Sequence, residues 1–482
     1  MDFSRRDCVR LGLLGGAVTA LGGCAHLANR FAEHHDDASL PSGDVDATSR
    51  LVNRLTFGPR PGDVAEVKSA GRTAYVDRLL DPDESEDLRL QFLLGRLDVF
   101  QTSSFESQDI PERVVLRQLQ QSAILRATYG KHQLRERLVD FWTNHFNIYS
   151  RKGLSAYRKA ADESTVIRKH AMDTFPKLLT ASAHSPAMLM YLDNQGNVLG
   201  RPNENYAREI MELHTMGVKS GYTQKDVQEV ARCFTGWTIE KRFLHARWAF
   251  RFDESLHDNG AKTVLGHSMP AGGGEKDADR VLQILGQHPA TARFISKKLC
   301  AYFLGEAGEK WVDRTAQTYN QTGGDIRAML RPILLSQELT DSPPILKRPF
   351  DYLVSALRAL DADTDGGAAI QEHLAKMGEP LYEWPMPDGY PSRTSAWTGT
   401  MLPRWNFVYA LSAGEIGGTH VDWGGLQHGH DAEKMFELTH ARRTSASDKL
   451  LVDKVAKEFK TGDDGVAGAG FLCLAAPSFQ WR

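Results

Sequence analysis

The stretch at residues 111–129, PERVVLRQLQQSAILRATY, shows most clearly which fold this sequence specifies. Its apolar side chains recur at intervals of three and four residues, the spacing that keeps them on one face of an α-helix. It begins with Pro111, and proline is common in the first turn of a helix. The same spacing recurs at residues 164–181, 276–286, 289–304 and 346–361. We therefore predict a mainly α-helical protein in which one large multi-helix domain spans residues 46–482.

The composition is that of an ordinary globular protein. Of the 482 residues, 41% are hydrophobic and 25% are charged, and the formal net charge is −3. Lys and Arg are spread along the chain, without the basic patch that nucleic-acid binding requires. We therefore expect no nucleic-acid partner. After residue 24 no uncharged apolar run reaches eighteen residues, so we expect no membrane-spanning helix there.

The first 24 residues carry a different kind of signal. The pair Arg5 and Arg6 precedes a short apolar, glycine-rich run that ends in the sequence LGGC at residues 21–24. This arrangement resembles a twin-arginine export signal closed by a lipoprotein box, in which Cys24 would carry the lipid. The alternatives are a chance arginine pair before an apolar stretch, or ordinary secretion with a later cleavage site.

We expect the mature protein to work in the periplasm or cell envelope, held at the membrane through the lipid on Cys24. Residues 25–45, AHLANRFAEHHDDASLPSGDV, are polar and would form a tether between this anchor and the folded domain. The twin-arginine route carries proteins that are already folded, so any bound molecule would be acquired before export.

One region departs from the helical pattern. Large apolar residues alternate with other residues over 248–253, which is typical of a strand. Residues 257–260, HDNG, supply a turn, and residues 262–265 return as a second short strand. Because Asn-Gly is a strong local signal for a hairpin, we predict a small β-hairpin insertion at about residues 245–267.

A second irregular region follows near the C-terminus. Residues 380–403, PLYEWPMPDGYPSRTSAWTGTMLP, contain five prolines and several large aromatic side chains, so they cannot remain helical for long. Long irregular loops in compact domains are usually functional or disordered, and the aromatic content argues against disorder. The candidate binding residues in this loop are Trp384, Asp388, Tyr390 and Trp397.

The segment at residues 203–214, NENYAREIMELH, concentrates polar groups. On a helical wheel, Glu204, Arg208 and Glu212 form a stripe with a spacing of four residues, so Arg208 can pair with both carboxylates. We interpret this stripe as structural ion pairs. His214 falls on the apolar side of the same helix, where the core should be.

A second histidine is placed in the same way. In the predicted helix at residues 134–149, LRERLVDFWTNHFNIY, His145 lies near the centre of an apolar face. Burying a neutral histidine costs roughly 1–3 kcal/mol for each unsatisfied ring nitrogen. The ordinary interpretation is a core histidine bonded to a carbonyl or a hydroxyl. The alternative is that His145 and His214 meet each other, a carboxylate or a divalent metal.

The predicted turn supplies further polar candidates, His257, Asp258 and Lys262. They either hold the turn through Asx hydrogen bonds or present polar groups to a ligand or metal. If the protein is an enzyme, the candidate acid/base residues are Glu209 and Asp258. Neither a Gly-x-Ser-x-Gly elbow nor a His-Glu-x-x-His zinc motif is present. The cofactor is therefore left open, with a divalent metal as one alternative.

Several segments, in this order, resemble a bacterial family known as domain of unknown function 1800. They cover nearly the whole chain after the tether. The matching segments are LVNRLTFGP at 51–59, FWTNHF at 141–146, residues 203–217, residues 221–237, residues 257–266, RPF at 348–350, WPMPDGY at 384–390 and APSFQ at 476–480.

The resemblance implies an exported, mostly helical protein, and the family has no established reaction. Genes of the family often neighbour one for an exported protein that resembles the alkaline-phosphatase and sulfatase superfamily, which implies a partner of that kind. Our leading hypothesis is a lipid-anchored envelope protein that binds a ligand or partner through a polar or metal pocket around His145 and His214. The alternatives are an envelope hydrolase or oxidoreductase, and a scaffold for the phosphatase-like protein.

Overall fold

The computed structural model describes residues 46–83, 85–102, 109–218, 220–240, 248–305, 308–427, 431–444, 446–458 and 463–482. The predicted signal at residues 1–24, with Arg5, Arg6 and Cys24, lies outside the described residues, and so does the predicted tether at 25–45. No described helix is both long and apolar enough to cross a membrane.

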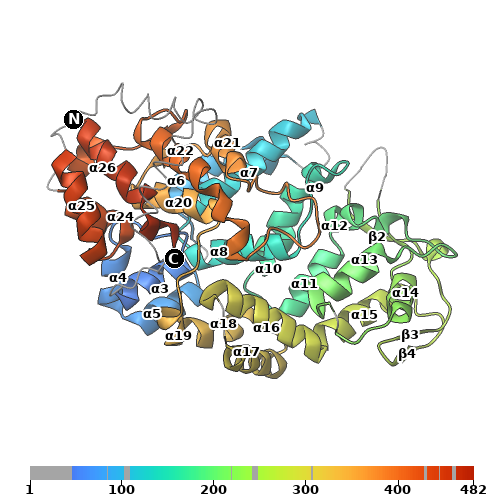
Figure 1. Ribbon diagram of the computed structural model, residues 1–482. Coiled ribbons are helices and arrows are strands. Elements are labelled where there is room, and N and C mark those ends of the chain that lie inside the picture. The colour runs from blue at the N-terminus through green and yellow to red at the C-terminus, as the bar shows by residue number, and fades with distance from the viewer. Residues whose placement is uncertain are drawn as a thin grey trace.

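Helices account for most of the described chain, so the prediction of a mainly α-helical protein is confirmed (Figure 1). The helices up to residue 200 are α3 (Ala47–Leu55), α4 (Asp63–Ala70), α5 (Arg72–Leu80), α6 (Leu88–Leu94), α7 (Glu112–Tyr129), α8 (Gln133–His145), α9 (Ser155–Asp162), α10 (Arg168–His170), α11 (Phe175–Ala183) and α12 (Pro186–Tyr191). Those after residue 200 are α13 (Glu204–Glu209), α14 (Gln224–Cys233), α15 (Lys276–Gln287), α16 (Pro289–Leu304), α17 (Glu309–Thr322), α18 (Ile326–Leu334), α19 (Glu338–Asp341), α20 (Pro349–Ala359), α21 (Ala368–Lys376), α22 (Met401–Ser412), α23 (Trp423–Gln427), α24 (Ala432–His440), α25 (Ala446–Glu458) and α26 (Asp463–Ala475).

Two large hydrophobic cores hold these helices together. The first joins α3, α5 and α8 to the run of helices from α11 to α18, and the second joins α6 and α7 to α20, α21 and α22. A smaller cluster packs α24 against α25 and α26. The C-terminal part of the chain contacts the first described helix: the Ser49 hydroxyl in α3 donates to the carbonyl of Ala441, directly after α24. Figure 1 shows the blue and red ends of the described chain on the same side, with α13, α14 and α15 at the opposite end.

Four of the five predicted helical segments form single helices, namely α7, α15, α16 and α20. The expectation of one helix at residues 164–181 is wrong. That segment is a π-helix, η4 (Glu163–Ile167), then α10, and then a separate helix α11 that starts at Phe175. The break has a physical reason: the Phe175 N–H donates to the carbonyl of Gly324 at 2.8 Å instead of continuing the helix. Pro176 follows in the first turn of α11, where a missing N–H costs nothing.

The predicted β-hairpin at 245–267 is wrong in its pairing, although both of its strands exist. The strand β2 (Phe250–Phe252) pairs with an earlier strand, β1 (Trp237–Ile239), and β3 (Lys262–Val264) pairs with β4 (His267–Met269). The tight turn of the second pair is Leu265-Gly266, with φ values of 49° and 79°, as a two-residue hairpin turn requires. The part of the prediction at residues 245–247 lies outside the described residues.

The proline- and aromatic-rich stretch is irregular, as expected, until two short 3₁₀ turns (Thr394–Ala396 and Thr398–Thr400) lead into α22. Tyr390 and Trp397 are buried in a small apolar cluster, with the ring of Trp384 packed 5.0 Å from that of Tyr390. A last small sheet pairs β5 (Asp363–Thr364) with β6 (Thr419–His420).

Candidate functional site

The WPMPDGY loop is fixed onto the C-terminal end of α8 by two asparagines. The Asn147 amide donates to the carbonyls of Trp384 and Met386, at 2.9 and 2.7 Å. The Asn144 amide donates to the carbonyl of Tyr390 at 3.0 Å and accepts from the N–H of the same residue at 2.7 Å. These four hydrogen bonds join two sequence segments that lie more than two hundred residues apart.

The turn of this loop depends on Gly389. Its φ is +75°, and a Cβ atom there would lie 2.2 Å from the carbonyl oxygen of Asn144, so only glycine fits. One residue earlier, the exposed Asp388 accepts a hydrogen bond of 3.0 Å from the indole of Trp384. The loop therefore holds Asp388 in a defined position beside the end of α8.

His145, the last residue of α8, meets His214 of the π-helix η6 (Ile210–Thr215). The two imidazole rings lie 6.0 Å apart, and Nε2 of His145 donates to the carbonyl of His214 at 3.0 Å. The other nitrogen of His145 accepts from the ammonium of Lys298 at 2.8 Å. Nε2 of the buried His214 has no hydrogen-bond partner among the described residues. The structure therefore brings the two predicted histidines together and adds a lysine.

Burial and charge explain the protonation states of this cluster. Burial and the nearby Lys298 lower the pKa of His214 to about 3 and that of His145 well below its ordinary value, so both rings are neutral. Burial also lowers the pKa of Lys298 to about 8, and the Asp388 charge opposes this shift. Lys298 is half-buried, and it forms no ion pair with any described residue.

Glu209 belongs to the same electrostatic neighbourhood. Burial raises the pKa of Glu209, and the charges of Glu212 and Asp388 raise it further, against the effect of Arg208. Its carboxylate is half-buried and makes no hydrogen bond or ion pair with the rest of the described chain. The Asp388 charge thus acts on both Lys298 and Glu209, a cation and a carboxylate that form no ion pair within the described chain.

The backbone of η6 contributes to this arrangement. Residues Ile210–Thr215 form a π-helix, in which the Thr215 hydroxyl donates to the carbonyl five residues earlier, at 2.6 Å. Such wider turns occur frequently at functional sites because they rotate the side chains that follow. Here the turn leaves His214 and Met211 buried and Leu213 half-buried.

The other side of α8 lines a polar cavity of about 50 Å³ between this helix, α20 and the start of the loop. Arg348 pairs with Asp140 and lies 3.2 Å from Oε1 of Glu379. The second oxygen of Glu379 accepts from the backbone N–H of Phe350 at 2.9 Å. Burial raises the pKa of Glu379 to about 7 although Arg348 opposes the shift. Asn144, Asn147 and Tyr390 line this cavity too, so the cavity borders the contact between the loop and the end of α8.

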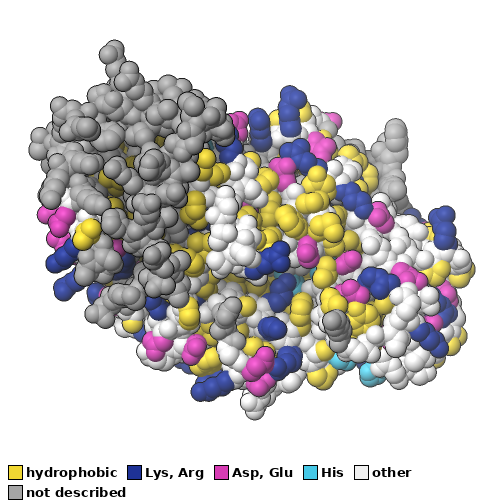
Figure 2. Space-filling view, in the orientation of Figure 1, with side chains coloured by type: hydrophobic (Ala, Val, Ile, Leu, Met, Phe, Trp, Pro, Cys, Tyr) yellow, Lys and Arg dark blue, Asp and Glu magenta, His cyan; other side chains and the backbone are white. Residues whose placement is uncertain are grey.

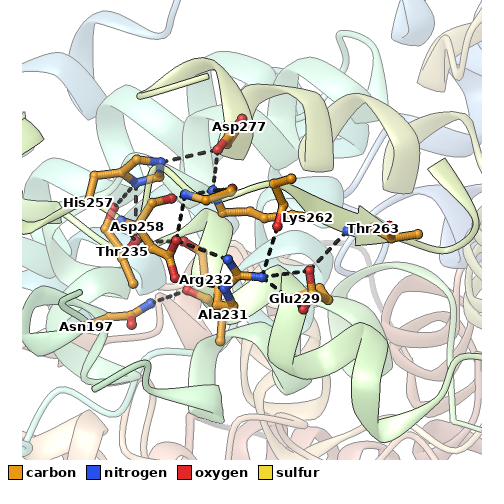
Figure 3. Close-up of polar contacts among 12 residues, drawn as sticks. Asn197, Glu229, Ala231, Arg232, Thr235, His257, Asp258, Lys262, Thr263 and Asp277 are labelled. Atoms are coloured by element: carbon orange, nitrogen blue, oxygen red, sulfur yellow. Dashed lines mark hydrogen bonds and ion pairs between the residues drawn. The ribbon is translucent and has the colours of Figure 1, made fainter. Parts of the chain in front are cut away.

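His257, Asp258 and Lys262 lie elsewhere, in a network between α14, β3 and α15 (Figure 3). The ring of His257 bonds to the carbonyl of Thr235 at 2.8 Å and lies 3.3 Å from Asp277. Lys262, also buried, donates to the same Asp277 carboxylate at 2.6 Å.

Asp258 makes the Asx turn that the sequence offered as one interpretation, because Oδ1 accepts from the N–H of Gly260 at 2.9 Å. Both of its oxygens also accept from the guanidinium of Arg232, at 2.8 and 3.1 Å, and this pairing lowers the pKa of Asp258 to about 2. The polar groups of His257, Asp258 and Lys262 thus bind one another's neighbours in this network. None of them contacts His145 or His214 within the described chain.

The stripe of Glu204, Arg208 and Glu212, which runs from α13 into η6, makes the contacts that its spacing predicts. Arg208 lies 3.5 Å from a carboxylate oxygen of Glu204 and 3.5 Å from one of Glu212. Gln224 and Tyr222 add hydrogen bonds to the same groups. Within the described residues, no three His, Cys, Asp or Glu side chains are placed so that they could hold a metal ion.

The family description "Protein of unknown function (DUF1800)" matches residues 50–481. The chain belongs to this family. No curated protein and no solved structure shows a significant match. The DUF1800 segments FWTNHF, NENYAREIMELH and WPMPDGY are the ones that converge around His145, His214 and Asp388.

Sequence reasoning missed Lys298, Asp140, Arg348 and Glu379. Lys298 had a weak signal, because it lies four residues after Phe294 and four before Tyr302, on a partly apolar face of its helix. In the sequence, Arg348 stands out only as the first residue of the RPF segment at 348–350, one of the segments of the family resemblance. On the side of the molecule that Figure 2 shows, apolar side chains gather over the centre, with Lys, Arg, Asp and Glu side chains among them.

Proposed function

We propose that this protein binds a small ligand with an acidic or other hydrogen-bond-accepting group, and that Lys298 holds this group. The observation that carries the proposal is the half-buried Lys298 ammonium, whose one hydrogen bond within the described part of the chain goes to the neutral His145. A charge removed from water is costly unless an opposite charge or an acceptor accompanies it. A carboxylate or phosphate on the ligand would supply that partner.

The neighbouring groups favour a ligand with more than one polar group. The unpartnered Nε2 atom of the neutral His214 ring would accept from or donate to a polar group of the ligand, according to which ring nitrogen carries the proton. Glu209 and Asp388 disfavour a purely anionic ligand and favour one that also carries an amino or hydroxyl group. Amino acids, sugar acids and short peptides combine these features.

A matched pair of variants tests the proposal. Lys298→Met removes the ammonium, and Lys297→Met removes an exposed lysine from the preceding position of the same helix. Thermal-shift screening with organic acids, amino acids, sugar acids and peptides should find a class that stabilises the wild type and Lys297→Met. We expect Lys298→Met to bind that class at least about tenfold more weakly, the loss of roughly 1.4 kcal/mol. An equal response of both variants would contradict the proposal.

We also propose that this binding takes place in the cell envelope, after export by the twin-arginine route and lipidation of Cys24. The sequence of the signal supports this proposal. Replacing Arg5 and Arg6 by lysine should retain the protein in the cytoplasm, and Cys24→Ser should release it from the membrane. Secretion that is unchanged by the double replacement would exclude the twin-arginine route.

A protein resembling the alkaline-phosphatase and sulfatase superfamily is the proposed partner. The support is the family resemblance alone, which also keeps open the role of a scaffold for that protein. Co-purification of the two natively expressed proteins would support the partnership. Failure to associate at micromolar concentrations would count against it.

The second candidate function is acid–base catalysis at the same site, by a hydrolase or oxidoreductase in which Glu209 transfers the proton. The raised pKa of the unpartnered Glu209 favours this role over one for Asp258, which is held ionised by Arg232. Glu209→Gln should abolish turnover of a substrate identified among the ligands while leaving its binding within about twofold. Unchanged turnover would exclude Glu209 as the acid or base.

A further inference from the structure

A second cavity lies where the beginning and the end of the described chain meet, far in sequence from the Lys298 site. Its volume is about 50 Å³, several times the roughly 10–15 Å³ that a single water needs. It is lined by α3, the residues before α20, the end of α24 and the last residues of the chain. Four of its lining residues are Lys or Arg, namely Arg50, Lys347, Arg442 and Arg482. The described residues that line it include no Asp or Glu.

Two of these cations are buried, and neither has a hydrogen-bonded carboxylate partner among the described residues. Lys347 is 3% exposed, and its ammonium donates to the hydroxyl of Ser355 at 2.8 Å and lies 3.7 Å from the centre of the Phe479 ring. It forms no ion pair within the described chain. Arg482 is 8% exposed, and its Nη1 atom has no hydrogen-bond partner among the described residues. Its Nε atom lies 3.8 Å from Asp351, a distance too long for a hydrogen bond.

Two further arginines, Arg442 and Arg50, line the cavity and add N–H donors to it. Arg442 forms a two-point pair with Asp448, at 2.6 and 3.2 Å. Arg50 donates to the carbonyls of Thr340 and Ser342 and is half-buried. Asp448, which pairs with Arg442, and Asp351, which pairs with Arg137, do not line the cavity.

His440 and Ser478 provide neutral polar groups in the lining of the same cavity. Nε2 of His440 lies 3.1 Å from the hydroxyl of Ser478, and its ring stacks on Phe436 at 3.8 Å. Burial and the charges of Arg442 and Lys347 lower the pKa of His440 well below its ordinary value, so it adds no charge. Burial and the neighbouring Arg404 and Arg482 lower the pKa of Lys347 to about 7, against the effect of Asp351. A bound anion would reverse this shift.

We propose that this cavity binds a small tetrahedral oxyanion, sulfate or phosphate, through Lys347, Arg482 and Arg50. Guanidinium groups bind such anions with paired hydrogen bonds, and a desolvated anion offsets the cost of the two buried cations. The phosphate comes either as the free ion or as the head group of a phosphate ester. Lys298 does not line this site. The bound anion would link α3, through Arg50, to the last residues of the chain, through Arg482.

The proposal is tested with the full chain in sodium sulfate against sodium chloride of the same ionic strength, followed by calorimetry and thermal unfolding. Sulfate keeps its charge across the neutral range, so titration of the probe does not confuse the result. We expect saturable binding by the wild type and by Arg327→Gln, which removes an exposed arginine elsewhere. Lys347→Met and Arg50→Gln should each weaken binding at least tenfold. No saturable effect beyond that of chloride, or unchanged affinity in both cavity variants, would overturn the proposal.

A measurement on the wild type keeps the test independent of folding in the variants. Selenate has the shape and charge of sulfate, and its anomalous scattering in a crystal should locate it between Lys347 and Arg482. Selenate elsewhere, or absent from the cavity at saturating concentration, would contradict the assignment. Parallel titrations with inorganic phosphate and glycerol 3-phosphate identify the source: tighter binding of the ester assigns a phosphate ester, and tighter binding of the ion assigns free phosphate.

Discussion

The ammonium of Lys298 lies 2.8 Å from Nδ1 of His145, so a half-buried lysine donates to a neutral histidine and to no carboxylate of the described residues. This relationship joins three segments that the sequence separates widely, since α8 carries His145, α16 carries Lys298 and η6 carries the carbonyl that receives the other His145 nitrogen. Polar clusters held at a cost to folding are typical of functional sites.

Lys298→Met should make the protein more stable at pH 7, because methionine keeps most of the packing and removes the desolvated charge. The folded pKa of about 8 lies below the ordinary lysine value of 10.5. The folded protein is therefore penalised below pH 8, and the penalty disappears as the pH rises from about 8 to 10.5. We expect a gain on the order of 1–2 kcal/mol at pH 7 and none at pH 10.5, measured by urea unfolding. A loss of stability at pH 7 would contradict this description of Lys298.

Glu379 should make stability fall as the pH rises. Its folded pKa of about 7 lies above the ordinary value of 4.5, so the folded state keeps a proton that the unfolded state has lost. The stability that this proton provides is complete below pH 4.5 and is lost as the pH rises through 7. Urea unfolding of the wild type and of Glu379→Gln at pH 5 and pH 8 isolates this effect. We expect the wild type to lose about 2.5 kcal/mol more than the variant between these pH values. Parallel profiles would show that Glu379 titrates normally.

Gly389→Ala should detach the WPMPDGY loop from α8. The new Cβ would lie 2.2 Å from the carbonyl of Asn144, and φ is +75°, so the loop must shift. We expect a loss of roughly 1–3 kcal/mol of stability and weaker ligand binding at Lys298, because Asp388 moves with the loop. Gly399→Ala is the control, since nothing lies within 4 Å of its added Cβ. Equal behaviour of the two variants would show that the loop does not depend on this turn.

Asp277→Asn should destabilise the network of Figure 3 without affecting the Lys298 site. The Asp277 carboxylate receives the buried Lys262 at 2.6 Å and faces His257 at 3.3 Å. Removing one partner of a buried ion pair typically costs about 3–5 kcal/mol because the other charge is left uncompensated. Denaturant unfolding measures the loss, and ligand binding by the folded fraction should be unchanged. Loss of binding at full stability would assign this network to the functional site instead.

The sequence was most informative where the interaction is local. The apolar faces around His145 and His214 predicted that both histidines are buried, and the spacing of Glu204, Arg208 and Glu212 predicted their ion pairs. Periodicity could not show that the two histidines face each other, since their partners come from different helices.

The features that were missed depend on contacts between distant segments. The strand β2 takes β1 as its partner instead of β3, because the Leu265-Gly266 turn commits β3 to β4. Arg348 finds Asp140 more than two hundred residues away. Lysine is usually exposed, so only the fold reveals that Lys298 is withdrawn from solvent.

The most direct test of the ligand-binding proposal is a crystal structure of the protein purified from its native host, with its bound contents identified by mass spectrometry. We predict a ligand with an acidic or hydrogen-bond-accepting group within hydrogen-bond distance of the Lys298 ammonium and a second contact to Nε2 of His214. Contact of Lys298 with a carboxylate of the protein itself, in a site without room for a ligand, would contradict the account.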